Sequence, residues 1–426
     1  MSVLKLLFHF ALLAIVVHPV FAEGEHNAKD LFKQYSDRIF KVRVLELSSG
    51  NQASIGSGFK IGESGRIITN FHVISEYVHY PDRYRIVVED KHGDNFNLQL
   101  INFDVVNDLA ILQSYNLNAS SISLAESLPL KGEPIYSLGN PHDLGLSVVP
   151  GTFNGITRRS LYGRIHISGA INAGMSGGPT LDQYGRVIGV NVASSGNQVG
   201  FLVPLNRLKR FIEKSRQQQL ASADYENTIR DQLYTNQQII YSNLLDAEWK
   251  TSRFGEADIP QEIADYVQCW GDNFSETDQK YDYVQSDCHA NEKIYLSRNF
   301  DTGAILLQYA WIETEQLNMF QFYNLLTLEG TSMGPDNMAT EDNVTNFKCH
   351  EGFIRADQGS PQTPVDKVAF CARTYKKYPG LYDVLYLSMS VHEDDRALLS
   401  HFSVSGVSKD TANNFLVKFF NGITWQ

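Results

Sequence analysis

Cysteine is scarce in this chain of 426 residues and absent from its N-terminal half. The four cysteines are Cys269, Cys288, Cys349 and Cys371, and no two of them form the Cys-x-x-Cys pair typical of zinc sites. This spacing argues against a metal centre built from their thiolates. An even number of cysteines predicts disulfides if the protein is exported, whereas free buried thiols are the alternative in a reducing compartment.

Long apolar runs are also missing after the first residues, so no later segment reaches the ~20 apolar residues that a membrane-spanning helix needs. The apolar stretch 6–17 follows Lys5 and precedes Val20 and Ala22, which are small enough for a signal peptidase. We therefore predict a signal peptide over residues 1–22 and an exported protein, periplasmic or secreted, without an integral span after cleavage. An uncleaved N-terminal anchor is the alternative.

Basic runs are lacking as well. Lys and Arg together number 36 against 48 Asp and Glu, which gives a net charge of -12. Without a basic patch to follow a phosphate backbone, nucleic-acid binding is not expected. The negative net charge is interpreted as favouring solubility. The length of the chain allows two domains with hydrophobic cores.

A serine between glycines is the most informative motif that is present. The segment 174–179 reads Gly-Met-Ser-Gly-Gly-Pro, with Ser176 as its third residue. A nucleophilic serine needs a tight turn whose backbone N–H groups converge where an oxyanion forms. Gly174 and Ser176 would supply those N–H groups. A plain glycine-rich turn is the alternative interpretation.

Two further segments carry partners for such a serine. His72 ends an apolar run and is a candidate general base, and Asp108 stands at the mouth of a short apolar strand. Separately, a packed core histidine and a turn aspartate would be ordinary. In the order His72, Asp108, Ser176 they match a chymotrypsin-type catalytic triad. This chemistry requires no metal and no organic cofactor.

Residues from about 30 to 212 resemble the protease domain of the HtrA/Deg family of trypsin-fold serine peptidases. The resemblance lies in the segments 56–59, 69–73, 107–112, 137–141, 170–179 and 200–204, which occur in family order. Two local departures are Met175, where the family commonly has asparagine, and Ser168-Gly169, where it commonly has aspartate and alanine. The resemblance implies polypeptide substrates and an active site in a cleft between two β-barrels.

Two missing carboxylates refine this expectation. Met175 stands where trypsin-type zymogens carry the aspartate that pairs with a new N-terminus, so activation by that route is excluded. Ala170 stands where trypsin-like enzymes form the base of the S1 pocket. With Ile171 and Val190, it predicts an apolar S1 pocket of limited size, a preference for small or medium aliphatic residues and broad specificity.

The pattern of the chain predicts a mostly β protein with three parts after the signal peptide. Short strands broken by Gly, Asn, Asp and Pro indicate a trypsin-like double β-barrel over residues 27–212. Apolar residues at helical spacing predict a helical connector over 213–250. Residues 251–426 are expected to form a smaller α+β domain that does not resemble a PDZ module.

A weak internal repeat marks this C-terminal domain. Residues 294–297 match 385–388, residues 304–309 match 397–402, and a helical stretch follows each copy. Because a cysteine pair precedes each copy, the repeat favours Cys269–Cys288 and Cys349–Cys371 among the three pairings. Chance similarity between aromatic-rich strands is the alternative.

Three functions remain open at this point. The first is an exported serine endopeptidase acting on unfolded proteins. The second is a chaperone-like module that holds peptides in the cleft. The third gives the main role to the C-terminal domain, which would bind a partner that the sequence does not identify.

Overall fold

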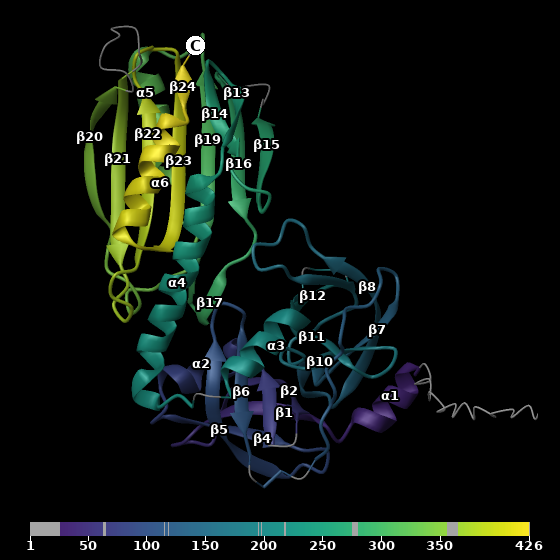
Figure 1. Cartoon of the computed structure of the whole chain (residues 1–426). Coiled ribbons are helices and arrows are strands. Elements are labelled where there is room, and N and C mark those ends of the chain that lie inside the picture. The colour runs from purple at the N-terminus through teal and green to yellow at the C-terminus, as the bar shows by residue number, and fades with distance from the viewer. Residues whose placement is uncertain are drawn as a thin grey trace, which may run out of the picture.

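The computed structural model describes residues 26–62, 65–114, 116–117, 119–194, 196, 198–216, 219–274, 280–355 and 365–425. The predicted signal peptide over residues 1–22 lies outside this described part. None of the helices in these ranges combines the length and the apolar character needed to cross a membrane. Figure 1 shows two barrels in the lower half of the view, a C-terminal sheet above them and α4 extending between the two.

The first barrel is closed, with antiparallel neighbours in the order β1-β2-β3-β6-β5-β4. Its strands alternate as half-buried strands do. In β1, Val42 and Val44 are fully buried, whereas Lys41 and Arg43, which alternate with them, reach the Glu89 carboxylate outside the barrel. The elements are β1 (Ile39–Glu46), β2 (Gln52–Ile61), β3 (Arg66–Thr69), α2 (Phe71–His79), β4 (Tyr84–Glu89), β5 (Asn95–Asp104) and β6 (Leu109–Gln113).

The second barrel is also closed, in the order β10-β11-β12-β9-β8-β7. The fold is therefore mostly β with a double barrel, as the sequence predicted. Its elements are β7 (Pro134–Gly139), the 3-10 turn η1 (Pro141–Asp143), β8 (Ser147–Ile156), β9 (Ile165–Ser168), β10 (Pro179–Asp182), β11 (Val187–Ser194), β12 (Val199–Pro204) and α3 (Leu205–Lys214).

One hydrophobic cluster joins the two barrels. Helix α1 (Ala28–Tyr35) begins at Asn27, whose side chain accepts hydrogen bonds from two N–H groups of the first turn. Leu31 of this helix packs in a cluster with Phe59 of the first barrel and Leu181 of the second. The barrels therefore share buried apolar surface, which stabilises their relative position.

The C-terminal part is built on a seven-stranded antiparallel sheet in the order β15-β16-β19-β23-β22-β21-β20. Helices cover its two opposite faces: Phe415 of α6 packs with Phe402 of β23, whereas Phe322 of α5 packs with Leu399 of the same strand. A smaller sheet, β13-β14-β24, lies beside it. The elements are β13 (Lys250–Phe254), β14 (Ala257–Glu262), β15 (Val267–Phe274), β16 (Asp282–Ala290), β17 (Ile294–Ser297), β18 (Phe300–Thr302), β19 (Ile305–Glu313), α5 (Met319–Ser332), β20 (Lys348–Arg355), β21 (Val365–Thr374), β22 (Tyr382–Ser390), β23 (Arg396–Val407), α6 (Lys409–Asn421) and β24 (Thr424–Trp425).

Helix α4 (Tyr225–Asp246) follows the 3-10 turn η2 (Ser222–Asp224) and lies within the segment for which the sequence predicts a connector. Its first half packs in the core of the first barrel through Ile229 and Leu233. Its second half packs in the core of the C-terminal sheet through Tyr241 and Leu244. The helix is therefore part of both hydrophobic cores rather than a solvated linker.

The structure contains the disulfides Cys269–Cys288 and Cys349–Cys371, each between directly paired residues of an edge strand and its neighbour. The repeat that suggested this pairing is only approximate. Residues 385–388 lie inside the large sheet in β22, but residues 294–297 form β17, which pairs with β18 in a separate two-stranded hairpin. In addition, α5 and α6 cover opposite faces of the sheet instead of one.

Candidate active site

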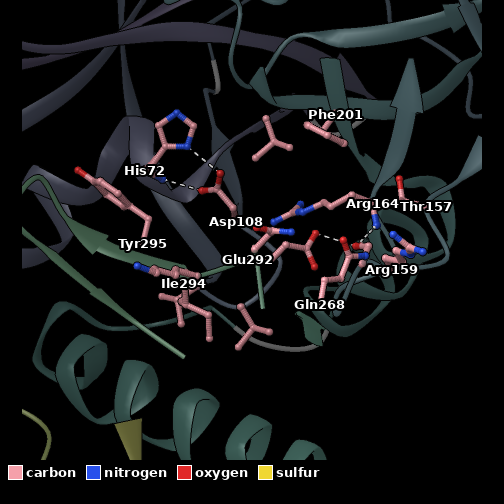
Figure 2. Close-up of a pocket in the computed structure, with 16 residues that line it drawn as sticks. His72, Asp108, Thr157, Arg159, Arg164, Phe201, Gln268, Glu292, Ile294 and Tyr295 are labelled. Carbon is pink, nitrogen blue, oxygen red and sulfur yellow. Dashed lines mark hydrogen bonds and ion pairs between the residues drawn. The ribbon is translucent and has the colours of Figure 1, made fainter. Parts of the chain in front are cut away.

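His72 and Asp108 are in direct contact at the edge of the first barrel. His72 is the second residue of α2, directly after β3, and Asp108 lies in the turn between β5 and β6. The Nδ1 atom of His72 lies 2.7 Å from Oδ2 of Asp108. The backbone N–H of His72 donates to the other carboxylate oxygen at 2.9 Å. Figure 2 shows both interactions. The carboxylate therefore fixes both the backbone and the ring of His72.

Asn70 fixes the backbone of Asp108. It precedes α2 but makes no side-chain cap, and its amide instead donates to the Asp108 carbonyl oxygen at 2.6 Å. Asp108 is 8% exposed. Burial lowers the pKa of His72, but the Asp108 charge and hydrogen bond raise it, so the pKa ends above the usual 6.5. The charge of Arg164 opposes this rise.

Ser176 lies in a tight turn between β9 and β10. Gly174 has φ +91° and Gly177 has φ +84°, a region that residues with side chains rarely adopt. A Cβ atom on Gly177 would lie 2.2 Å from the Ser57 carbonyl oxygen and 3.0 Å from the Asn70 nitrogen. The glycine therefore lets the serine turn pack directly against the start of α2, where His72 stands.

Ser57 fastens this turn to the first barrel. Its N–H donates to the Ser176 carbonyl oxygen at 2.8 Å, and its hydroxyl donates to the Gly174 carbonyl oxygen at 2.7 Å. Ser57 is fully buried. The serine turn of the second barrel is thus held by a side chain of the first, across the junction where His72 lies.

Two backbone N–H groups of the turn have no acceptor. Among the described residues, neither Gly174 nor Ser176 donates its N–H to another group. The preceding carbonyl, that of Ala173, accepts from the His142 N–H at 2.8 Å. Because the peptide bond is planar and trans, the Gly174 N–H points away from that carbonyl. Unpaired donors are uncommon at buried positions, and they are what an oxyanion site requires.

The remaining predicted residues lie around this turn. Met175 is fully buried in the core of the second barrel. Ile171 is in the same cluster, whereas Val190 is fully buried in the cluster between the barrels. Ala170 is half-buried. Within the described part of the chain, no hydrogen bond joins Ser176 Oγ to His72, a contact that in free enzymes is often long.

A cavity of about 900 Å³ opens beside His72 and Asp108. Figure 2 shows side chains from both barrels and from the C-terminal part around it. Sequence reasoning missed the C-terminal lining, which includes Glu292 and Tyr295. Glu292 precedes β17 and Tyr295 lies in it, and the sequence around them carries no signal of a role at this site. The predicted S1 residues do not line this cavity. No group of three potential metal ligands occurs among the described residues.

Two closed barrels with a His–Asp pair and a glycine-flanked serine at their junction define a trypsin-fold serine peptidase domain. Residues 56–190 match the family model of the trypsin-like peptidase domain. This match and the relatives described next show that the first half of the chain is similar to HtrA/Deg-like members of that class.

Among similar proteins, the probable periplasmic serine endoprotease DegP-like of Bartonella henselae is 36% identical over 204 residues, covering 45% of this chain and 39% of the relative. Human serine protease HTRA3 is 31% identical over 177 residues, covering 39% of each chain. A crystal structure of the serine endoprotease from Yersinia pestis has 25% identity and a TM-score of 0.40, covering 45% of this chain and 66% of that one. The chain thus spans about two fifths of the length of these two curated relatives.

Proposed function

We propose that this protein is an exported serine endopeptidase. The observation that carries the proposal is the His72–Asp108 contact at the junction where the glycine turn presents Ser176. Relatives named as periplasmic endoproteases support an exported, periplasmic location. Polypeptides are the proposed substrates.

The geometry suggests how each residue would act. Because Asp108 occupies Nδ1, the lone pair of His72 available for proton transfer is on Nε2. His72 would take the Ser176 proton as Oγ forms a bond to the substrate carbonyl carbon. The N–H groups of Gly174 and Ser176 would bind the oxyanion. His72 would then give its proton to the leaving amine as the peptide bond breaks, and a water molecule would hydrolyse the acyl-enzyme by the same steps.

We propose an apolar S1 pocket for small or medium aliphatic side chains, with Ala170 at its base. Ile171 and Val190 are buried in the adjoining cores, so they would support the pocket wall from behind. Apolar pockets distinguish substrates by only about 1–3 kcal/mol per methylene. Cleavage of unfolded proteins at many sites follows from this weak discrimination.

A labelling experiment tests the proposal. Full-length protein without residues 1–22 is treated with a fluorophosphonate and incubated with unfolded casein, and the casein fragments are sequenced. We expect labelling at Ser176, cleavage after Val, Ala, Ile or Leu, and loss of both activities in the Ser176→Ala variant. Ser57→Ala is unsuitable as a control because Ser57 holds the turn, so the exposed Ser168→Ala variant serves instead.

Each contrary result has a definite meaning. Labelling that persists in Ser176→Ala would refute the assignment of the nucleophile. A dominant preference for Lys or Arg would refute the S1 position. Peptide binding without labelling or cleavage would favour the peptide-holding module over the endopeptidase.

A further inference from the structure

The β17–β18 hairpin leaves the C-terminal sheet and reaches the protease domain. The sequence counterpart of β17 is residues 385–388, in the second half of the C-terminal domain. These residues form β22 inside the sheet, between β21 and β23. In the first half, β16 pairs directly with β19, and the chain between them is free to extend outward. Figure 1 shows β17 at the junction with the barrels, near α2. In the first half, an arm that contacts the other domain therefore stands where the second half has a strand of the sheet.

Apolar burial fixes this arm on the first barrel. Ile294, Leu296 and Phe300 are each 3% exposed or less and belong to the hydrophobic cluster of that barrel. Removing apolar side chains of this size from water stabilises the contact between the arm and the barrel. A polar contact also orients the arm along α2. The Nε2 atom of His79, at the end of α2, lies 2.8 Å from the Leu296 carbonyl oxygen. The arm therefore packs along the same helix that carries His72.

The second barrel is attached to the arm as well. One Glu292 oxygen accepts from the Ser160 hydroxyl at 2.7 Å, and the other accepts from the Tyr162 N–H at 2.9 Å. Both partners lie in the loop between β8 and β9. Charge-assisted hydrogen bonds are stronger and more directional than neutral ones. The segment 291–295 thus bridges both barrels and lines the cavity beside His72 and Asp108.

Tyr295 is the residue of the arm that meets His72. The two ring centroids are 5.9 Å apart and the rings are inclined by 71°, an edge-to-face arrangement. Ser75, one turn further along α2, donates its hydroxyl to the His72 carbonyl oxygen at 3.1 Å. Figure 2 shows Tyr295 beside His72 at one end of the cavity. Asp108 and Tyr295 therefore confine the imidazole from different directions.

We propose that Tyr295 is a positioning residue for His72, and that the C-terminal domain thereby completes the active site of the protease domain. The kinetic test rests on the proposed function. A misplacement of about 1 Å can cost about 100-fold in rate, so an imidazole confined on only one side would transfer protons less efficiently.

The test compares Tyr295 variants in the full-length protein. Tyr295→Ala should lower kcat on a peptide substrate about 10- to 100-fold and leave KM within about threefold. Tyr295→Phe keeps the ring and should stay near the wild-type kcat. Tyr234→Ala, which removes a tyrosine that is 39% exposed on α4, is the matched control and should change neither constant.

A titration of His72 separates positioning from a general loss of structure. The charged groups that act on His72 are Asp108 and Arg164, and both stay in place in the variant. Tyr295→Ala exposes the imidazole to water, which removes part of the burial that lowers its pKa. The His72 NMR titration, and the acid limb of kcat/KM, should therefore move to higher pH in Tyr295→Ala but not in Tyr234→Ala.

Unchanged kcat and an unchanged His72 titration in a folded Tyr295→Ala variant would overturn the proposal. If Tyr295→Ala does not fold, Tyr295→Leu replaces it, and a kcat equal to that of Tyr295→Phe would overturn the proposal in the same way. If the wild type neither labels nor cleaves, the proposed function fails, but the NMR titration still decides whether Tyr295 confines His72.

Discussion

Asp108 has φ 58°, a left-handed conformation that aspartate and asparagine adopt more readily than other residues with side chains. Its carbonyl is held by Asn70, and its carboxylate accepts from the N–H of His72. These contacts keep the backbone in place. Asparagine can therefore replace Asp108 without added backbone strain, which makes the charge the only major change.

The Asp108→Asn variant should lower kcat about 10⁴-fold, because an amide no longer selects the imidazole tautomer or stabilises its cation. In the wild type, only the neutral form of His72 accepts a proton, so kcat/KM should rise with pH through an apparent pKa above 6.5. Removing the carboxylate charge should lower this pKa and move the acid limb to lower pH.

Steady-state kinetics at a series of pH values measure both effects. The control is Asp82→Asn, which removes a carboxylate from an exposed position. Equal kinetics of the Asp108 and Asp82 variants would show that Asp108 has no role in proton transfer.

Among the elements, α4 shows how one helix can belong to two cores. Ile229 is fully buried in the cluster of the first barrel, whereas Ile239 of the same helix is 58% exposed. The two isoleucines have the same chemistry and the same helical environment. They differ in burial, which is the variable that sets the cost of removing their methyl groups.

Ile229→Ala should lower the free energy of unfolding by about 2–4 kcal/mol, because it leaves a cavity in the barrel core. Ile239→Ala should change it by less than about 0.5 kcal/mol. Urea denaturation followed by tryptophan fluorescence compares the two variants. A loss for Ile229→Ala as small as that for Ile239→Ala would mean that α4 does not contribute to the barrel core.

The sequence predicted the elements that carry a local signal. The glycine turn around Ser176 and the position of His72 after an apolar strand could be predicted because each depends on residues adjacent in the sequence. The helical spacing of Ile229 and Leu233 predicted a helix but not the partners of its two ends. Tyr295 could not be identified, because an aromatic residue in a strand pattern is equally typical of an ordinary sheet core.

The repeat predicted equivalent places for residues 294–297 and 385–388, and this was wrong at β17 for a related reason. Residues 294–297 resemble 385–388 because both have alternating apolar and polar side chains. Alternation reports that one face of a strand is buried but not against which surface. Leu296 satisfies the pattern by packing in the first barrel, whereas its counterpart Leu387 lies beside Gly330 of α5 on the C-terminal sheet.

At the scale of the whole molecule, the N-terminal half contains no cysteine. This suggests that reduction of the disulfides should lower the stability of the C-terminal domain alone. The structure leads to a different expectation. The cluster of the first barrel includes Ile229 of α4 and Leu296 of β17, so neither half can lose its fold without exposing the other. We therefore expect the two halves to unfold in one cooperative transition.

Reduction of Cys269–Cys288 and Cys349–Cys371 should lower the midpoint of that shared transition. Each disulfide closes a loop of about 20 residues, which constrains the unfolded chain by roughly 3 kcal/mol. Calorimetry of oxidised and reduced protein measures the effect, with non-reducing peptide maps to verify the pairing. Two separate transitions, of which only one responds to the reductant, would contradict the shared core.

The position of β17 in the chain also determines when the cleft can be completed during synthesis. Polypeptides emerge with the N-terminus first, and domains fold as they become available. His72, Asp108 and Ser176 all emerge well before Glu292 and Tyr295, which reach the barrels only with the hairpin that ends at Thr302. A growing chain therefore carries the three proposed catalytic residues for a time without the segment that lines the cavity beside His72 and Asp108. Assembly of this cavity is deferred until β17 and β18 have been made, and it is completed by a segment that contributes none of the proposed catalytic residues.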